Sequence, residues 1–146
     1  MQAVVTNIGV ATAAGANVFR GPGRQLPDDA EVAIAVHYGA DSEPQFHNQF
    51  ADSWLTIYVD LHVRGEQPLD RTSGAVSEYE TTLLNLRKQV HIQLMADIKQ
   101  GLDFVMDTES QGAGEITYGN DAENILADMR TEWRIKYRSS INDPSQ

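Results

Sequence analysis

The fold is decided by residues 127–138, which read Ala-Asp-Met-Arg-Thr-Glu-Trp-Arg-Ile-Lys-Tyr-Arg. Charged side chains occupy every second position of this run, and the positions between them are mostly apolar. Because successive side chains of a strand point to opposite faces, the alternation predicts one strand with a buried face and a charged face. Such a run is long for a strand of a globular protein. A long strand of this kind favours assembly with other proteins over the enclosure of a pocket.

Two earlier segments also have strand patterns. Residues 31–38 are apolar or small on both faces, which predicts a strand in the interior of its sheet. Residues 54–63 carry Leu, Ile and Val at alternate positions, which predicts a core face. Their other face carries Trp54, Tyr58 and polar side chains, a mixture that suits contact with a partner.

The strongest helix pattern covers residues 77–99, where apolar side chains recur at steps of three and four residues. A shorter helix is expected within residues 1–15, where the spacing is helical but interrupted by glycine. Shorter strands are expected at 102–108 and 115–118.

The remaining segments are expected to be connections. The long ones, 39–52 and 107–125, are predicted to be loops with a functional role or plain surface loops. Residues 139–146 are expected to form a flexible tail. Together the elements predict a single domain over residues 1–146 with an α+β fold. It has a mixed or antiparallel twisted sheet of four to five strands, with one long and one short helix packed on one face.

Composition excludes several classes of protein. The chain has 146 residues, no cysteine, and 41% hydrophobic residues, so one core is expected and disulfides, thiolate zinc sites and cysteine nucleophiles are excluded. Its 21 acidic and 11 basic residues give a net charge of −10, which argues against a primary nucleic-acid binder. Neither a signal peptide nor a membrane-spanning stretch is expected.

No catalytic motif is found. The serines have no nucleophile-elbow motif around them, and the glycine-rich runs do not fit a phosphate loop or a dinucleotide fingerprint. Asp60 and His62 share one strand face, and His37 lies beside them if the two strands are neighbours. A small metal-dependent enzyme or binding domain that uses these three residues is the alternative from another class. The more economical interpretation is an ordinary polar face, and neither a metal nor another cofactor is expected.

The basic residues of the predicted final strand gather on one face. Arg130, Arg134, Lys136 and Arg138 are four of the chain's eleven basic residues. One interpretation is a solvated face with balanced charge. The other is a docking strip for an acidic neighbour, which includes another copy of the same chain.

The order of these segments is similar to a known family. Val18-Phe19-Arg20-Gly21 and Leu26-Pro27 come before the strand of residues 33–40. The strand of residues 54–63, a long helix and the run Met129-Arg-Thr-Glu-Trp-Arg-Ile-Lys-Tyr137 follow. This order resembles the tail terminator (minor tail protein U-like) family of long-tailed bacteriophages. The resemblance covers residues 18–138 and is carried by element order, element lengths and the closing run.

The resemblance implies a structural, non-enzymatic virion protein that forms a hexameric ring. The ring caps the tail tube, ends its growth and presents a joining surface to the head-side connector. Implied partners are the chain itself, the major tail tube protein and the connector or stopper protein. The protein would lie in the tail or neck of the virion, and in the host cytoplasm during assembly. A head–tail connector or stopper subunit is the alternative within the same particle.

Ring closure requires contact between two different surfaces of one subunit. The charged strand face and the acidic segments 27–31 and 107–109 are predicted as the two halves of that contact. An acidic chain also suits a conduit through which DNA passes without specific binding. The candidate interface residues are Arg130, Glu132, Arg134, Lys136, Arg138, Trp54, Tyr58, Asp28, Asp29 and Glu109.

Overall fold

The computed structural model describes residues 2–21, 30–65, 75–121 and 124–141. In chain order the elements are α1 (Gln2–Ala11), β1 (Val18–Arg20), β2 (Val32–Asp41), β3 (Gln45–His47), β4 (Phe50–Gly65), α2 (Ala75–Ala96), β5 (Val105–Ala113), β6 (Thr117–Asp121) and β7 (Asn124–Ser140). The prediction of an α+β fold with one long and one short helix is confirmed for these residues.

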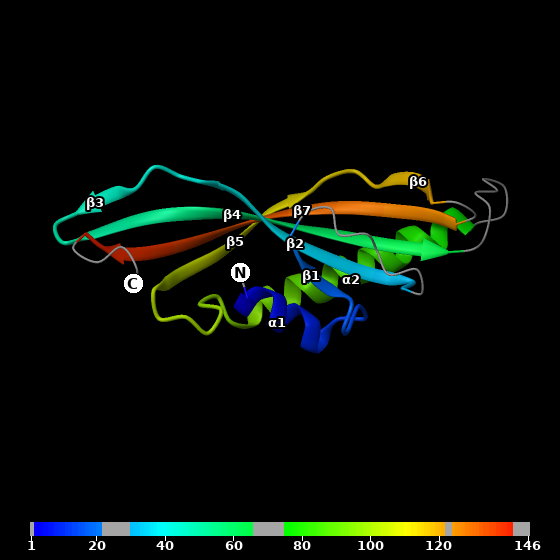
Figure 1. Cartoon of the computed structure of the whole chain (residues 1–146), viewed down its shortest axis with the longest axis horizontal. Helices are drawn as coiled ribbons and strands as arrows, with labels where there is room; N and C mark the ends of the chain where they lie inside the picture. The colour runs from blue at the N-terminus through cyan, green and yellow to red at the C-terminus, as the bar shows by residue number, and fades with distance from the viewer. Residues whose placement is uncertain (1, 22–29, 66–74, 122–123, 142–146) are drawn as a thin grey trace.

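The strands form one mixed, twisted sheet with β1, β2, β4, β7 and β5 in that order (Figure 1). Strand β1 is parallel to β2, and the other pairs are antiparallel. The short strands β3 and β6 pair with β4 and β7 respectively. Because β2 has a neighbour on each side, the prediction that it lies inside the sheet is confirmed.

Two very long strands form the centre of the sheet. The pairing of β4 with β7 is unbroken from Phe50 opposite Ser140 to Gly65 opposite Ile125. Alternation of side chains buries one row of each strand, including Ile57 and Leu61 of β4 and Trp133 of β7. The charged row of β7 lies on the other face, as predicted, but the strand is internal, since β5 and β6 pair along its other side.

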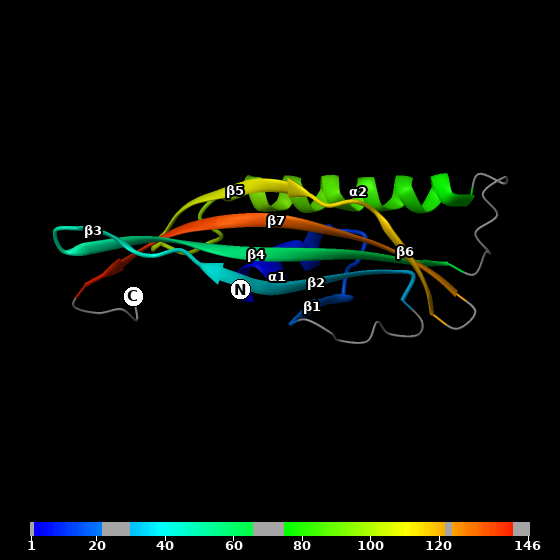
Figure 2. The ribbon, with the colours of Figure 1, turned by 90° about the horizontal axis from the view of Figure 1, so that it is seen from above.

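Both helices cover the same face of the sheet (Figure 2). Helix α2 contributes Leu83, Leu86, Val90 and Leu94 to the core, each at most 1% exposed. The helix layer is shorter than the sheet. At 1.5 Å per residue the 22 residues of α2 span about 33 Å, whereas the 16 residues of β4 span about 50 Å at 3.3 Å per residue. One end of the sheet therefore extends beyond the helices (Figures 1 and 2).

The predicted number of strands is too low, since the sheet has seven strands and not four to five. The connection predicted at 39–52 contains the end of β2, all of β3 and the start of β4, and residues 41–50 are exposed. The connection predicted at 107–125 contains most of β5 and all of β6. These segments are polar and lack an apolar row, so they form strands only because β4 and β7 offer unpaired edges.

Helix α2 ends at Ala96, three residues before the predicted end. The carboxylate of Asp97 accepts hydrogen bonds from the backbone N–H groups of Lys99 and Gly101, which closes a tight turn. The buried amide of Gln100 donates to the carbonyl oxygens of Leu94 and Asp97, both at 2.8 Å, and so satisfies the helix end. The strand predicted from residue 102 consequently begins at 105.

The predicted tail is shorter than expected. Ser139 and Ser140 belong to β7, where they pair with Ala51 and Phe50 of β4. Residues 142–146 lie outside the described residues, so the flexible tail predicted there stays a prediction. The end of β7 is therefore part of the sheet that extends beyond the helices.

Candidate functional site

The charged row of β7 faces a complementary row of β4. Asp60 lies directly opposite Arg130, and Asp52 lies directly opposite Arg138. Each arginine donates two hydrogen bonds to its carboxylate, at 2.7 and 2.9 Å in both pairs. Bidentate pairs of this kind are the strongest and most directional ion pairs in proteins. Two of the cations predicted to dock an acidic neighbour are therefore neutralised within the chain.

Two histidines extend this network. His37 of β2 lies next to β4, and its Nε2 is 2.8 Å from Oδ2 of Asp60. His62 of β4 shares a hydrogen bond with Asp128, which lies directly opposite on β7. The three side chains that the sequence grouped as a possible metal site do lie on one face, but His62 pairs with Asp128 and not with Asp60.

The network holds both aspartates in their charged form. Burial opposes ionisation of Asp60, but hydrogen bonds from Arg130 and His37 and their charges lower the pKa of its carboxyl below the ordinary value of 3.8. The hydrogen bond from Arg138 outweighs burial and, with the charges of Arg138 and Lys136, lowers the pKa of Asp52.

Aromatic side chains of the same face also have cations over their rings. The guanidinium of Arg130 lies 5.1 Å from the ring centre of Tyr58, and Nζ of Lys136 lies 5.8 Å from the ring centre of Trp54. These are cation–π distances. Trp54 and Tyr58, predicted to meet a partner, are thus partly covered by side chains of their own sheet.

The remaining predicted interface residues are distributed differently. Arg134 is exposed, and it lies between Thr56 of β4 and Glu109 of β5 in the register of the sheet. Glu132 lies opposite Tyr58.

Glu109 and the neighbouring Asp107 belong to β5 and face β7 of the same subunit. The prediction that segment 107–109 is a loop on a separate surface is therefore wrong, because this segment is a strand paired with β7. Two other candidates, Asp28 and Asp29, lie outside the described residues. Of the acidic segment 27–31, only residues 30 and 31 are described.

This cross-strand arrangement specifies the register of the two long strands. A shift of two residues would keep the apolar row buried, so burial alone does not exclude it. Such a shift would place Asp60 opposite Asp128 or Glu132, both acidic, in place of Arg130. The alternating charges of β7 therefore select one pairing among those that the apolar pattern permits.

The metal alternative gains no support from this geometry. Both carboxylate oxygens of Asp60 already accept hydrogen bonds from Arg130, and Oδ2 is shared with His37. Among the described residues no group of three or more His, Asp or Glu side chains is arranged to hold a metal ion.

A second surface lies where the sheet extends beyond the helices. We call this part the arm and define it as residues 41–55 and 136–141. The core face of the sheet continues along it, because Phe46 lies opposite Ala51 and Tyr137 lies opposite Ser53. Neither α1 nor α2 covers this face (Figures 1 and 2). Phe46 is 68% exposed and Ile141, beyond the end of β7, is 44% exposed.

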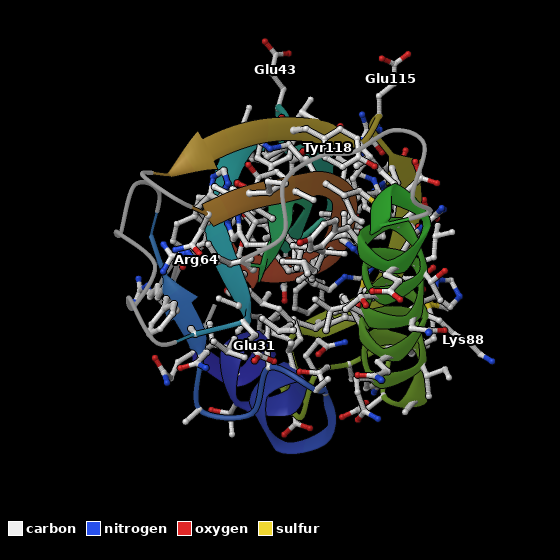
Figure 3. All side chains as sticks on the ribbon, turned by 90° about the vertical axis from the view of Figure 1, so that its right-hand side faces the viewer. Glu31, Glu43, Arg64, Lys88, Glu115 and Tyr118 are labelled. Carbon is white, nitrogen blue, oxygen red and sulfur yellow. The ribbon has the colours of Figure 1, made fainter. Side chains whose placement is uncertain are left out.

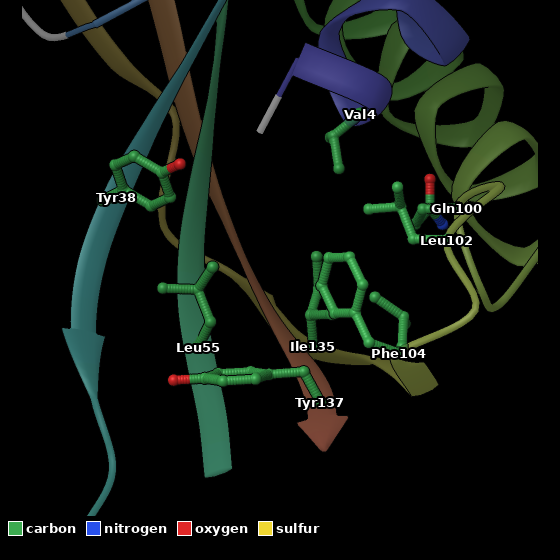
Figure 4. Close-up of a pocket in the computed structure, with 9 residues that line it drawn as sticks. Val4, Tyr38, Leu55, Gln100, Leu102, Phe104, Ile135 and Tyr137 are labelled. Carbon is green, nitrogen blue, oxygen red and sulfur yellow. The ribbon is translucent and has the colours of Figure 1, made fainter. Parts of the chain in front are cut away.

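An apolar cavity of about 210 Å³ opens where the arm leaves the core. Figure 4 shows Tyr38, Leu55 and Tyr137 of the sheet on one side of it and Val4, Leu102 and Phe104 on the other. Tyr38 and Phe104 are 49% and 44% exposed. A neighbouring hollow of about 370 Å³ shares Tyr38, Leu55 and Tyr137 and has Asp41 at its rim. We call the uncovered core face of the arm the underside of the arm. It consists of Phe46, Leu55 and Tyr137, together with Tyr38 and Phe104 where the arm meets the covered part of the sheet.

Helix α2 carries the third surface. Besides its buried row it has an outer face formed by Leu84, Arg87, Lys88, His91, Ile92 and Met95, all exposed. Five of these line a groove of about 430 Å³. Leu84 and Ile92 are each 51% exposed and Met95 is 41% exposed. Large apolar side chains therefore lie on the side of α2 that faces away from the sheet.

Sequence reasoning did not single out the underside of the arm or the outer face of α2. The signal for the first was partial, since the alternation of β7 continues to Tyr137 and Arg138 and then gives way to Ser139 and Ser140. The signal for the second was the spacing of Leu84, Ile92 and Met95, which places them on one helix face. Neither signal shows by itself that the surface is uncovered.

No protein-family model matches the chain, and no curated protein matches it. None of the helices in the described residues is long and apolar enough to cross a membrane.

Proposed function

We propose that this protein is a structural subunit of a phage tail, the tail terminator. Copies of the chain form a ring that caps the tail tube, ends tube growth and offers the joining surface for the head-side connector. Its partners are further copies of itself, the major tail tube protein and the connector or stopper. The ring lies in the virion, after assembly in the host cytoplasm.

The observation that carries this proposal is the arm. A sheet that continues past its own helices with aromatic side chains on its uncovered core face is built to be covered by another protein. A protein that worked alone would leave Phe46 and Tyr38 in water at the expense of solubility. Assembly buries such side chains, and a ring repeats that burial at every subunit boundary.

The charge of the chain supports the same role. A ring through which a genome passes must not retain DNA, and a net charge of −10 repels phosphate groups. The four basic residues on the outer row of β7 do not contradict this, because Arg130 and Arg138 are neutralised by Asp60 and Asp52.

The test is direct. Purified protein is mixed with tail tubes and imaged by negative-stain electron microscopy. We expect six-fold rings with a central hole, bound to one end of each tube, and tubes capped in this way should stop elongating when tube protein is added. Rings that bind only to head-side assemblies would replace the proposal with a connector. Protein that binds neither assembly would overturn it.

A further inference from the structure

Two uncovered apolar surfaces of one chain lie at different places in this fold. The underside of the arm projects at one end, while the outer face of α2 lies alongside the covered part of the sheet (Figures 1 and 2). The arm points away from its own helices, so it does not reach its own α2. Each surface therefore needs a different molecule to cover it.

The pattern of α2 is that of a helix between two layers. A helix at the surface of a globular protein normally has one apolar stripe and a polar outer face. Here the sheet covers Leu83, Leu86 and Val90, but Leu84, Ile92 and Met95 face the other way. No element among the described residues forms that second layer. A sheet face without a helix is the complementary shape, and the underside of the arm is such a face.

Charge identifies which molecule supplies that layer. Between residues 81 and 96 the only ionised side chains are Arg87 and Lys88, in a chain with a net charge of −10. Lys88 points away from the sheet (Figure 3). On the underside of the arm Asp41 lines the hollow beside Tyr38 and Leu55, and residues 39–50 contain no lysine or arginine. An acidic, aromatic surface and a basic, apolar surface are thus carried by the same chain.

We propose that the arm of one copy lies across the outer face of α2 of a second copy. The underside of the arm covers Leu84, Ile92 and Met95, while Asp41 at its rim faces Arg87 and Lys88. This contact joins two different surfaces, so a pair of copies leaves one arm and one outer face of α2 free. Further copies bind there until the assembly closes into a ring or grows into a filament. The inference rests on the proposed function only for closure into a ring.

The contact is tested by reciprocal charge reversal in the full chain. Asp41→Lys and Lys88→Glu should each weaken self-association on the order of tenfold or more, because each places like charges in contact. The double variant, or an equal mixture of the two single variants, should regain association. Glu115→Lys and Lys99→Glu are the matched controls, since they make the same charge changes at exposed positions outside the contact. Figure 3 shows that Glu115 projects on the side of the molecule opposite α1.

Sedimentation velocity over a range of protein concentrations measures the association, and circular dichroism establishes that each variant is folded. Phe46→Ser provides a second, uncharged variant that should also weaken association. Wild-type protein that stays monomeric overturns the inference, as do reversals that behave like their controls. In either case the arm is covered by a different protein.

The outcomes separate this inference from the proposed function. If the reversals break and restore association but the assemblies do not cap tail tubes, the contact stands and the terminator role fails. If rings of the Asp41→Lys variant form and cap tubes like those of the wild type, the role stands and this contact fails.

Discussion

The covered part of the sheet and the arm share the same two strands but have different surroundings. In the covered part the apolar row of β4 and β7 lies under α1 and α2, and Ile57, Leu61 and Trp133 are at most 2% exposed. In the arm the same face continues with neither helix over it, and Phe46 is 68% exposed. Small side chains of this face in the arm, Ala51 and Ser53, are still only 5% exposed. Alternation therefore selects the face of a side chain, whereas burial of a large side chain also requires a second layer.

The largest effect is expected at Trp133, the largest fully buried side chain. Its indole N–H donates to the hydroxyl of Thr131, which donates to the carbonyl oxygen of Val59. Trp133→Ala should lower the free energy of unfolding by about 3–5 kcal/mol, through lost burial and a cavity. Urea denaturation measures the change. Phe46→Ala in the arm is the control and should stay within about 0.5 kcal/mol of wild type; a large loss there would show that the arm is part of the folded core.

The next effect concerns the ion pairs that run from the covered part into the arm. Asp60→Asn should destabilise the protein by about 1–3 kcal/mol at neutral pH, because the guanidinium of Arg130 loses a charged acceptor in a partly buried site. Chemical denaturation checks this, with Glu43→Gln as an exposed control.

Measuring the free energy of unfolding against pH shows how much of it depends on the charges of Asp60 and Asp52. Since the pKa values of Asp60 and Asp52 are lowered in the folded protein, their stabilisation is complete above the ordinary carboxyl pKa of 3.8. It disappears as pH falls from that value through the lowered pKa. Asp52→Asn combined with Asp60→Asn should therefore flatten the loss of stability below about pH 4. An unchanged acid transition would contradict the assignment.

A smaller effect is expected at Gly39, where the arm begins. A Cβ at this position would lie 2.8 Å from the ring of Tyr58 and 3.0 Å from Thr56, so β2 would have to shift away from β4. Gly39→Ala should cost about 1 kcal/mol, measured by thermal denaturation. Gly119→Ala is the matched control, because a Cβ there meets no atom within 4 Å. Equal stability of the two variants would show that the junction is tolerant of such a shift.

The smallest effect on stability is expected for Arg134. It is exposed and has no ion pair among the described residues, unlike Arg130 in the same row. Arg134→Glu should change the free energy of unfolding by less than about 0.5 kcal/mol. Sedimentation velocity of Arg134→Glu tests the charged face as well. Loss of self-association in this variant would show that the charged face, and not the arm, forms the subunit contact.

Much of the fold was predictable from local pattern. The two faces of β7, the core face of β4 and the buried row of α2 follow from periods of two and 3.6 residues, which depend only on backbone geometry. The strand expected at 115–118 overlaps β6, which begins two residues later, at Thr117. The short strand β3 was not predictable, because it lacks an apolar row and owes its strand form to the edge of β4. The early end of α2 was not predictable either. It depends on the carboxylate of Asp97, which binds the backbone N–H groups of Lys99 and Gly101 and closes a turn where the helix would otherwise continue.

The candidate site was predictable only in part. The charged row of β7 was visible, but its partner Asp52 lay in a segment expected to be a loop, and residues that pair across 86 positions share no local signal. The surfaces now proposed for assembly consist of apolar side chains, which look the same in sequence whether buried or exposed.

Alternation along the chain determined which side chains share a face, and composition determined an acidic chain without cysteine. Only the tertiary structure decided that the cations of β7 meet carboxylates of β4, because strand register is a property of distant segments brought together. It also decided that the helices end before the sheet does. A helix rises less than half as far per residue as a strand, so α2 is too short to cover the length of β4.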